Sequence, residues 1–165
     1  MKERFKQAIV YYFDKPYDFV IDLIGAHPTP DQEQVLKAIP QALRDRKPIA
    51  IKSGHGVGKT ACESWIILWF MFTRPNCKIP CTAPTQHQLY DILWAELSKW
   101  HQRCQVKDMF EWTATHFRNK EMPEDWFAVA RSSTKPENMQ GFHSEHLLFI
   151  IEEASGVASN IMEVV

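Results

Sequence analysis

The sequence lacks strong charge of either sign and any long hydrophobic run. Its 165 residues carry a formal net charge of −1, without the overall positive charge typical of nucleic-acid-binding proteins, so any DNA contact would depend on a local patch. The longest apolar run, WIILWFMF at 65–72, is far shorter than the ~20 residues that span a bilayer. It predicts a helix buried on most of its faces, and we expect no membrane partner.

The cysteines are few and irregularly spaced, at Cys62, Cys77, Cys81 and Cys104. No signal peptide precedes them, so a reduced, cytoplasmic setting is expected. Cys77/Cys81 and His101/Cys104 could be drawn as metal ligands, but no second pair stands at zinc-finger spacing. We therefore expect buried or incidental thiols and no zinc site.

A hydrophobic content of 45% is enough for the core of about one domain. The hydrophobic pattern predicts strands that alternate with helices, which is typical of an α/β fold with a mostly parallel sheet covered by helices on both faces. Helices are expected within 1–28 and over 29–43, 59–74 and 85–100. Strands are expected over 48–52, 77–83, 110–117, 126–131 and 147–155. We expect a helical lead-in over 1–28 and a single domain over 29–165.

Residues 53–60 (SGHGVGKT) match most of the Walker A pattern of a P-loop NTPase, with Ser53 in place of the first glycine. Such a loop needs small residues, so that backbone N–H groups approach a polyphosphate, and a helix N-terminus behind them. Lys59 would reach the phosphates and Thr60 would bind Mg²⁺. The pattern predicts ATP and Mg²⁺ as cofactors, held by Ser53, Gly54, His55, Gly56, Val57, Gly58, Lys59 and Thr60. The alternative is a glycine-rich turn with a solvated lysine.

A run of five apolar residues, 147–151, is followed by Glu152 and Glu153. Ligands of open α/β sheets bind at this carboxyl end of the strands. We therefore predict that Glu152 holds Mg²⁺ through water, and that Glu153 polarises the attacking water and is catalytic together with Lys59. The alternative is a solvated pair of carboxylates that caps the next turn.

Four stretches together resemble the large terminase subunit of tailed phages and prophages: DFVIDLIGAHPTPDQEQVL at 18–36, SGHGVGKT at 53–60, CTAPTQHQ at 81–88 and PENMQGFHSEHLLFIIEEASGV at 136–157. The resemblance implies a RecA-like ATPase domain over 29–165. It also implies a homo-oligomeric ring that packages double-stranded DNA into the procapsid in the host bacterial cytoplasm, with a portal protein and a small terminase subunit as partners.

The resemblance also places single residues. Gln32 stands where the family has a glutamine that recognises adenine, although a Thr29-x-x-Gln32 capping box explains the same residue without a ligand. Thr82 and Thr85 match a loop near nucleotide or DNA, and helix capping is the favoured alternative for both.

Two residues depart from the family pattern. His55 stands where many members carry an arginine, and Arg131 is a candidate substitute for that charge. Glu152 replaces the usual aspartate and is longer by one methylene. Either departure would slow hydrolysis.

The family's ATPase domain continues beyond the acidic strand, with a further strand inserted between the phosphate-loop strand and the acidic strand, and then a nuclease domain. This sequence ends at Val165. We expect an incomplete domain, cut after the acidic strand as a fragment or truncated gene product, with no DNA cleavage. Two other functions stay open: a non-catalytic nucleotide-binding or interaction remnant, and another DNA-dependent ATPase of helicase-like architecture.

Overall fold

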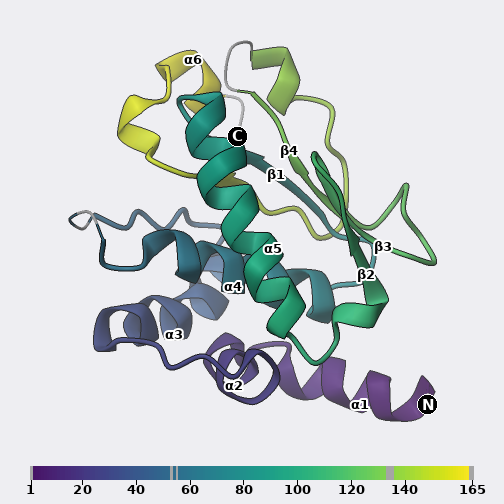
Figure 1. Ribbon diagram of the computed structural model, residues 1–165. Helices are drawn as coiled ribbons and strands as arrows, with labels where there is room; N and C mark the ends of the chain where they lie inside the picture. The colour runs from purple at the N-terminus through teal and green to yellow at the C-terminus, as the bar shows by residue number, and fades with distance from the viewer. Residues whose placement is uncertain (1, 53, 55, 133–135, 164–165) are drawn as a thin grey trace.

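The computed structural model describes residues 2–52, 54, 56–132 and 136–163 (Figure 1). Its helices are α1 (Lys2–Tyr12), α2 (Pro16–Phe19), α3 (Pro30–Asp45), α4 (Lys59–Thr73), α5 (Ala95–Arg103) and α6 (Ser159–Met162). Its strands are β1 (Lys78–Thr82), β2 (Phe110–Trp112), β3 (His116–Asn119), β4 (Phe127–Ala130) and β5 (Ile150–Ile151). Two π-helical segments, η1 (Val20–Ile24) and η2 (His87–Trp94), and three 3₁₀ turns, η3 (Lys107–Met109), η4 (Pro136–Met139) and η5 (Ala154–Gly156), complete it.

The strands form one sheet in the order β2-β3-β4-β1-β5. Strand β1 pairs in parallel with β4 and with β5, whereas β3 runs antiparallel to both β2 and β4. Four strands therefore share one direction and β3 opposes them. The predicted α/β fold with a mostly parallel sheet is confirmed.

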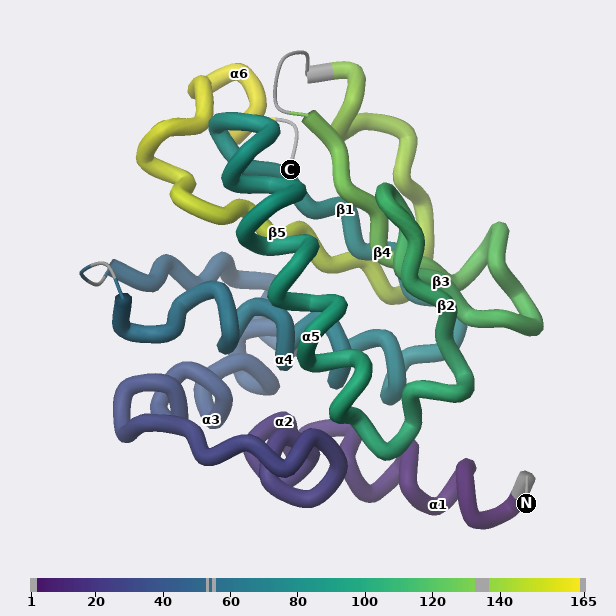
Figure 2. The backbone as a smooth tube through the Cα atoms, in the orientation of Figure 1, coloured from purple at the N-terminus to yellow at the C-terminus, as the bar shows by residue number. Residues whose placement is uncertain are grey.

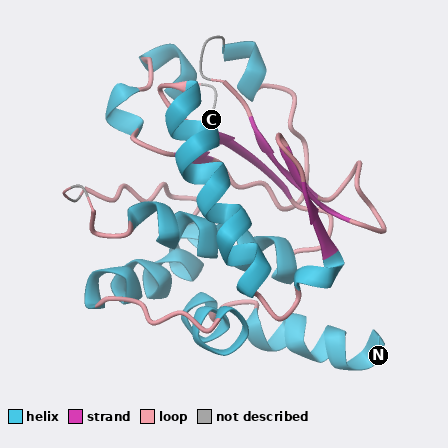
Figure 3. Ribbon diagram, in the orientation of Figure 1, coloured by secondary structure: helices cyan, strands magenta, loops and turns pink. Residues whose placement is uncertain are grey.

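The apolar run at 65–72 forms the middle of α4, and all eight of its residues are buried. Helices α1, α3 and α5 pack around α4, and in the view of Figure 3 α5 crosses in front of the strands. Ile79 and Cys81 of β1 join the same hydrophobic cluster. The predicted buried helix is confirmed, and among the described residues no helix is long and apolar enough to span a membrane.

The opposite face of the sheet has a much smaller apolar cluster beside β5. Met139, Val157 and Ile161 form it, with Phe149 and Ile151 packed against them. Ile150 faces the main core, as expected from the alternation of side chains along a strand. Among the described residues, the long helices thus cover one face, and the segments that reach the other are the short η4 and α6, whereas the sequence predicted helices on both.

The predicted strand at 48–52 does not form. These residues are exposed and belong to no ladder of the described sheet, with Ile49 40% and Ile51 37% exposed. An extended segment becomes a strand only by pairing its backbone with a neighbour. The short apolar run is present, but the described chain supplies no partner for it.

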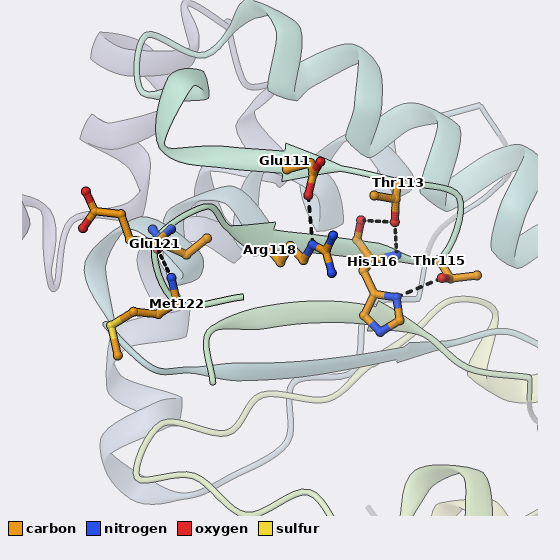
Figure 4. Close-up of polar contacts among 8 residues, drawn as sticks. Glu111, Thr113, Thr115, His116, Arg118, Glu121 and Met122 are labelled. Carbon is orange, nitrogen blue, oxygen red and sulfur yellow. Dashed lines mark hydrogen bonds and ion pairs between the residues drawn. The ribbon is translucent and has the colours of Figure 1, made fainter. Parts of the chain in front are cut away.

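The segment 110–117 was predicted as one strand and is instead the first part of a β2–β3 hairpin (Figure 4). The turn is closed by Thr113, whose backbone N–H donates to the His116 carbonyl (2.7 Å) and whose Oγ1 accepts from the His116 N–H (3.0 Å). On the hairpin, Arg118 Nε donates to Glu111 Oε2 at 2.9 Å. These contacts give the polar residues of the hairpin a structural role.

Two further expectations need correction. Strand β5 is confined to Ile150–Ile151, preceded by a single bridge at Leu147, because the chain turns at Glu153 into η5. The helical pattern of 85–100 predicts a core-facing stripe that includes Leu89, Ile92 and Leu93. Leu89 and Leu93 are buried, but Ile92 is 39% exposed. The π-helical winding of η2 holds more residues per turn than an α-helix and rotates Ile92 outward.

Candidate functional site

The predicted loop helix and acidic strand meet at the carboxyl edge of the sheet. Lys59 and Thr60 are the first residues of α4, and Glu152 and Glu153 follow β5 directly (Figures 1 and 2). Lys59 Nζ lies 3.1 Å from Glu153 Oε1. Thr60 Oγ1 lies 3.4 Å from Glu152 Oε1 and 3.5 Å from Oε2. Four residues that the sequence singled out therefore face one another in two pairs, each joining positions more than ninety residues apart.

The glycines before α4 adopt a conformation that other residues rarely take. Gly56 has φ +78° and Gly58, the N-cap of α4, has φ +81°. Both angles lie in the left-handed region, which glycine enters at no steric cost. The backbone therefore turns into α4 with its N-terminal N–H groups pointing out of the helix, as anion binding requires.

The remaining loop residues are exposed or outside the described chain. Gly54 is exposed and has open space around it, and Val57 is 47% exposed. The predicted ligands Ser53 and His55 lie outside the described residues.

Glu153 has an unusual backbone for a residue with a side chain, with φ +49°. A left-handed non-glycine residue costs on the order of 1–3 kcal/mol, and such residues gather at functional sites. The conformation turns the chain from β5 into η5 while the side chain, 28% exposed, meets the 19% exposed Lys59 side chain.

Glu63, one helical turn beyond Thr60, is a site residue that the sequence analysis missed. It lies beside Glu152, which is 4% exposed. Burial, and then side-chain hydrogen bonding with Glu152 and the negative charge of Glu152, raise the pKa of Glu63 well above its usual value, while Lys59 opposes the rise. Among the described residues, Glu63 Oε2 has no hydrogen-bond partner although it is buried. The available signal was an acidic residue inside an otherwise apolar helix.

The oxygen atoms at this edge fit a small hard cation. Mg²⁺ prefers oxygen ligands and keeps several waters or phosphate oxygens of its own. The Thr60 hydroxyl and the Glu152 carboxylate offer such ligands side by side. The described chain holds no group of three or more His, Cys, Asp or Glu residues arranged to bind a metal. A cation here would therefore take its remaining ligands from a bound phosphate and from water.

Gln32 lies against the loop and not in open space. It is 8% exposed, its Oε1 accepts from the Thr29 N–H (2.9 Å), and its Nε2 donates to the Gly58 carbonyl (2.8 Å). The Thr29 Oγ1 accepts from the Gln32 N–H at 3.4 Å, so the predicted capping box is confirmed. Gln32 thus touches the phosphate loop through the loop's backbone.

The other threonine and arginine candidates lie on neighbouring elements. Thr85 Oγ1 accepts from the Gln88 N–H at 3.1 Å and so caps the helix that follows. Thr82 is fully buried at the end of β1, where its carbonyl accepts from the Glu152 N–H at 2.9 Å. Arg131 is exposed at the end of β4.

The loops that follow β1 and β5 pack closely together. A Cβ added to Gly156 would lie 2.7 Å from Pro84 Cγ, which is closer than real Cβ contacts. The segments 81–88 and 136–157, which the sequence analysis singled out, therefore meet beside the acidic pair.

All four cysteines are free and buried. Burial raises the pKa of each thiol, for Cys62 to about 12 and for Cys104 to about 11. Burial therefore favours the neutral thiol over the thiolate that reactive cysteines use.

Comparison with known proteins gives one relative. The chain is similar to a protein described as "Probable terminase, large subunit" of Enterobacteria phage P7, with 26% identity over 175 aligned positions. The alignment covers 98% of this chain and 34% of the phage protein, so the chain spans about a third of the length of that relative. No family model matches the chain, and no solved structure matches it. The resemblance to terminase large subunits is confirmed over nearly the whole chain.

Proposed function

We propose that this chain is the Mg·ATP-binding part of a P-loop ATPase with RecA-like architecture, acting in the large terminase subunit of a tailed phage or prophage. The observation that carries the proposal is the convergence of two pairs, Lys59 with Glu153 and Thr60 with Glu152, at the N-terminus of α4. A lysine, a hydroxyl and two carboxylates beside a glycine-rich turn are the groups that nucleotide hydrolysis needs.

Each side chain has a role that follows from its place. Lys59 binds β- and γ-phosphate oxygens together with the backbone N–H groups of 54–60. Thr60 and Glu152 hold Mg²⁺, and Glu63 fixes the orientation of Glu152. Glu153 orients the attacking water and accepts its proton. Bound Mg·ATP supplies the phosphoanhydride bond that is cleaved.

In this arrangement the Glu153 carboxylate and the phosphates both bind the Lys59 ammonium group. Lys59 Nζ lies within hydrogen-bond distance of Glu153, and phosphate oxygens would compete with that carboxylate. Nucleotide binding would therefore release Glu153 from Lys59 and free it for the water.

The remaining parts of the proposal concern the whole protein. The relative's printed name describes a terminase large subunit, and we extend this to ATP-driven packaging of double-stranded DNA by a ring of subunits. The portal protein and the small terminase subunit would be its partners in the host cytoplasm.

The test is a titration of the purified chain with a fluorescent ATP analogue, with and without Mg²⁺, beside Lys59→Ala. Lys6→Ala on the exposed side of α1 is the charge-matched control. Magnesium-dependent binding that survives in the control and is lost in Lys59→Ala supports the proposal. Equal binding by both variants would contradict it.

A second candidate, nucleotide binding without turnover, is favoured by the exposed segment 48–52. That segment leads into the phosphate loop and is unpaired among the described strands, so the loop lacks the rigid strand that usually precedes it. Turnover by the wild-type chain that falls in Glu153→Gln would exclude this candidate.

A further inference from the structure

The Gln32 side chain connects two elements that the sequence keeps far apart. Through Oε1 it caps the first turn of α3, and through Nε2 it holds the carbonyl of Gly58, 26 positions further on. It is nearly buried, so both polar atoms are engaged by the protein. Helices α3 and α4 pack beside each other at this point (Figure 2).

The Gly58 carbonyl is also the first acceptor of α4. It receives the Cys62 N–H at 3.1 Å as well as Gln32 Nε2 at 2.8 Å. Gly58 stands directly before Lys59 and Thr60, so fixing this carbonyl fixes the point from which both side chains start. A Cβ on Gly58 would lie 2.5 Å from Gln32 Nε2, which shows how closely the amide fits against the loop.

We infer that Gln32 is a positioning residue of the phosphate loop, which binds no adenine and orients the start of α4 through the Gly58 carbonyl. The inference rests on the proposed function, since it assigns Gln32 a part in polyphosphate binding. The amide has one further N–H and one further lone pair beyond its hydrogen bonds to Thr29 and Gly58, but Gln32 is only 8% exposed, so adenine would have to displace neighbouring protein atoms to reach them. Positioning needs no such change.

The two roles predict different ligand dependence. A residue that reads adenine discriminates ATP from GTP and contributes nothing to tripolyphosphate, which has no base. A residue that positions the loop affects all three ligands by the same factor, because all three use the same N–H groups and the same lysine.

The test uses two substitutions with different residual contacts. Gln32→Glu keeps an acceptor for the Thr29 N–H, since Thr-x-x-Glu is itself a capping box, but loses the donor to Gly58. Gln32→Met is uncharged and of similar length, and so controls for the added negative charge. Gln34→Ala, on the exposed side of α3, is the matched control.

Binding of ATP, GTP and tripolyphosphate is measured for each variant in the presence of Mg²⁺. We expect both Gln32 variants to lower the affinity for all three ligands by a common factor of about ten, as for the loss of one positioning hydrogen bond. Gln34→Ala is expected to leave all three affinities unchanged. Weaker binding of ATP together with unchanged binding of tripolyphosphate would overturn the inference in favour of adenine recognition. Unchanged binding of all three would overturn it as well.

Amide hydrogen exchange of the peptide 56–63 gives a readout that needs no nucleotide. We expect faster exchange in Gln32→Glu and Gln32→Met than in the wild type and in Gln34→Ala. Equal exchange in all four proteins would overturn the inference. A wild type that binds no polyphosphate would contradict the proposed function, and the exchange result would still decide whether Gln32 holds the loop.

Discussion

Lys59 Nζ and Glu153 Oε1 lie 3.1 Å apart, although 94 positions separate them in the sequence. The pair joins the first residue of α4 to the second residue after the end of β5. Lys59, the lysine of the predicted phosphate loop, thus contacts Glu153, the predicted catalytic base. The predictions below follow from this contact and its neighbours.

Glu153→Gln is expected to tighten ATP binding while it abolishes turnover. The substitution removes the anion that competes with phosphate for Lys59, and a partly buried pair of this kind is worth roughly 1 kcal/mol, or about fivefold in affinity. It also removes the proton acceptor. Fluorescence titration and a phosphate-release assay measure both effects, and weaker binding in Glu153→Gln would contradict the competition.

Thr60→Val is expected to remove the magnesium dependence of nucleotide binding. The two side chains have nearly the same shape, but valine offers no oxygen to a cation beside Glu152. Thr60→Ser keeps the hydroxyl and serves as the control. Titrations with and without Mg²⁺ should differ by about tenfold or more in the wild type and in Thr60→Ser, and by nothing in Thr60→Val. A dependence that persists in Thr60→Val would assign the cation elsewhere.

The buried acid Glu63 predicts a stability that falls as the pH rises. Its pKa in the folded chain is raised above the ordinary value of 4.5, so its contribution is fully present below pH 4.5 and is lost as the pH rises through the folded pKa. The slope attributable to one such group is at most roughly 1.4 kcal/mol per pH unit. Urea unfolding of Glu63→Gln should show a flatter pH dependence than the wild type above pH 4.5. If the free energy of unfolding varied with pH in parallel for the wild type and Glu63→Gln, ionisation of Glu63 would cost the folded chain little stability.

Gly156→Ala is expected to destabilise the chain by about 1–3 kcal/mol, as overpacking does. The new Cβ meets the rigid ring of Pro84 at 2.7 Å. Gly54→Ala, with open space around its Cβ, is the control for removing a glycine. Pro84→Ala combined with Gly156→Ala should recover most of the loss, because the two sites are in contact. Strictly additive effects in denaturant unfolding would argue against the contact.

The sequence predicted the parts of the fold that local chemistry determines. The Thr29–Gln32 capping box and the buried apolar run at 65–72 of α4 follow from capping geometry and hydrophobic pattern. It also predicted that the acids after the buried strand stand at the carboxyl edge of an α/β sheet, where ligands bind; the contact between Lys59 and Glu153 was not predicted.

The errors arise where structure depends on partners distant in the sequence. The segment 48–52 has the short apolar run of a strand, but pairing, which local sequence does not encode, decides whether a strand forms. The turn at Thr113 is held by its hydrogen bonds to His116, with no glycine or proline to announce it. Glu63 gave no motif, since its importance depends on Glu152, which lies close only in the folded chain.

The most direct test of the central claim is the crystal structure of this chain with Mg²⁺ and a slowly hydrolysed ATP analogue. The account predicts the β- and γ-phosphates at residues 54–60, with Lys59 Nζ moved from Glu153 onto a phosphate oxygen and Thr60 Oγ1 on the metal. An analogue bound away from 54–60, or bound there with Lys59 still paired to Glu153, would contradict it.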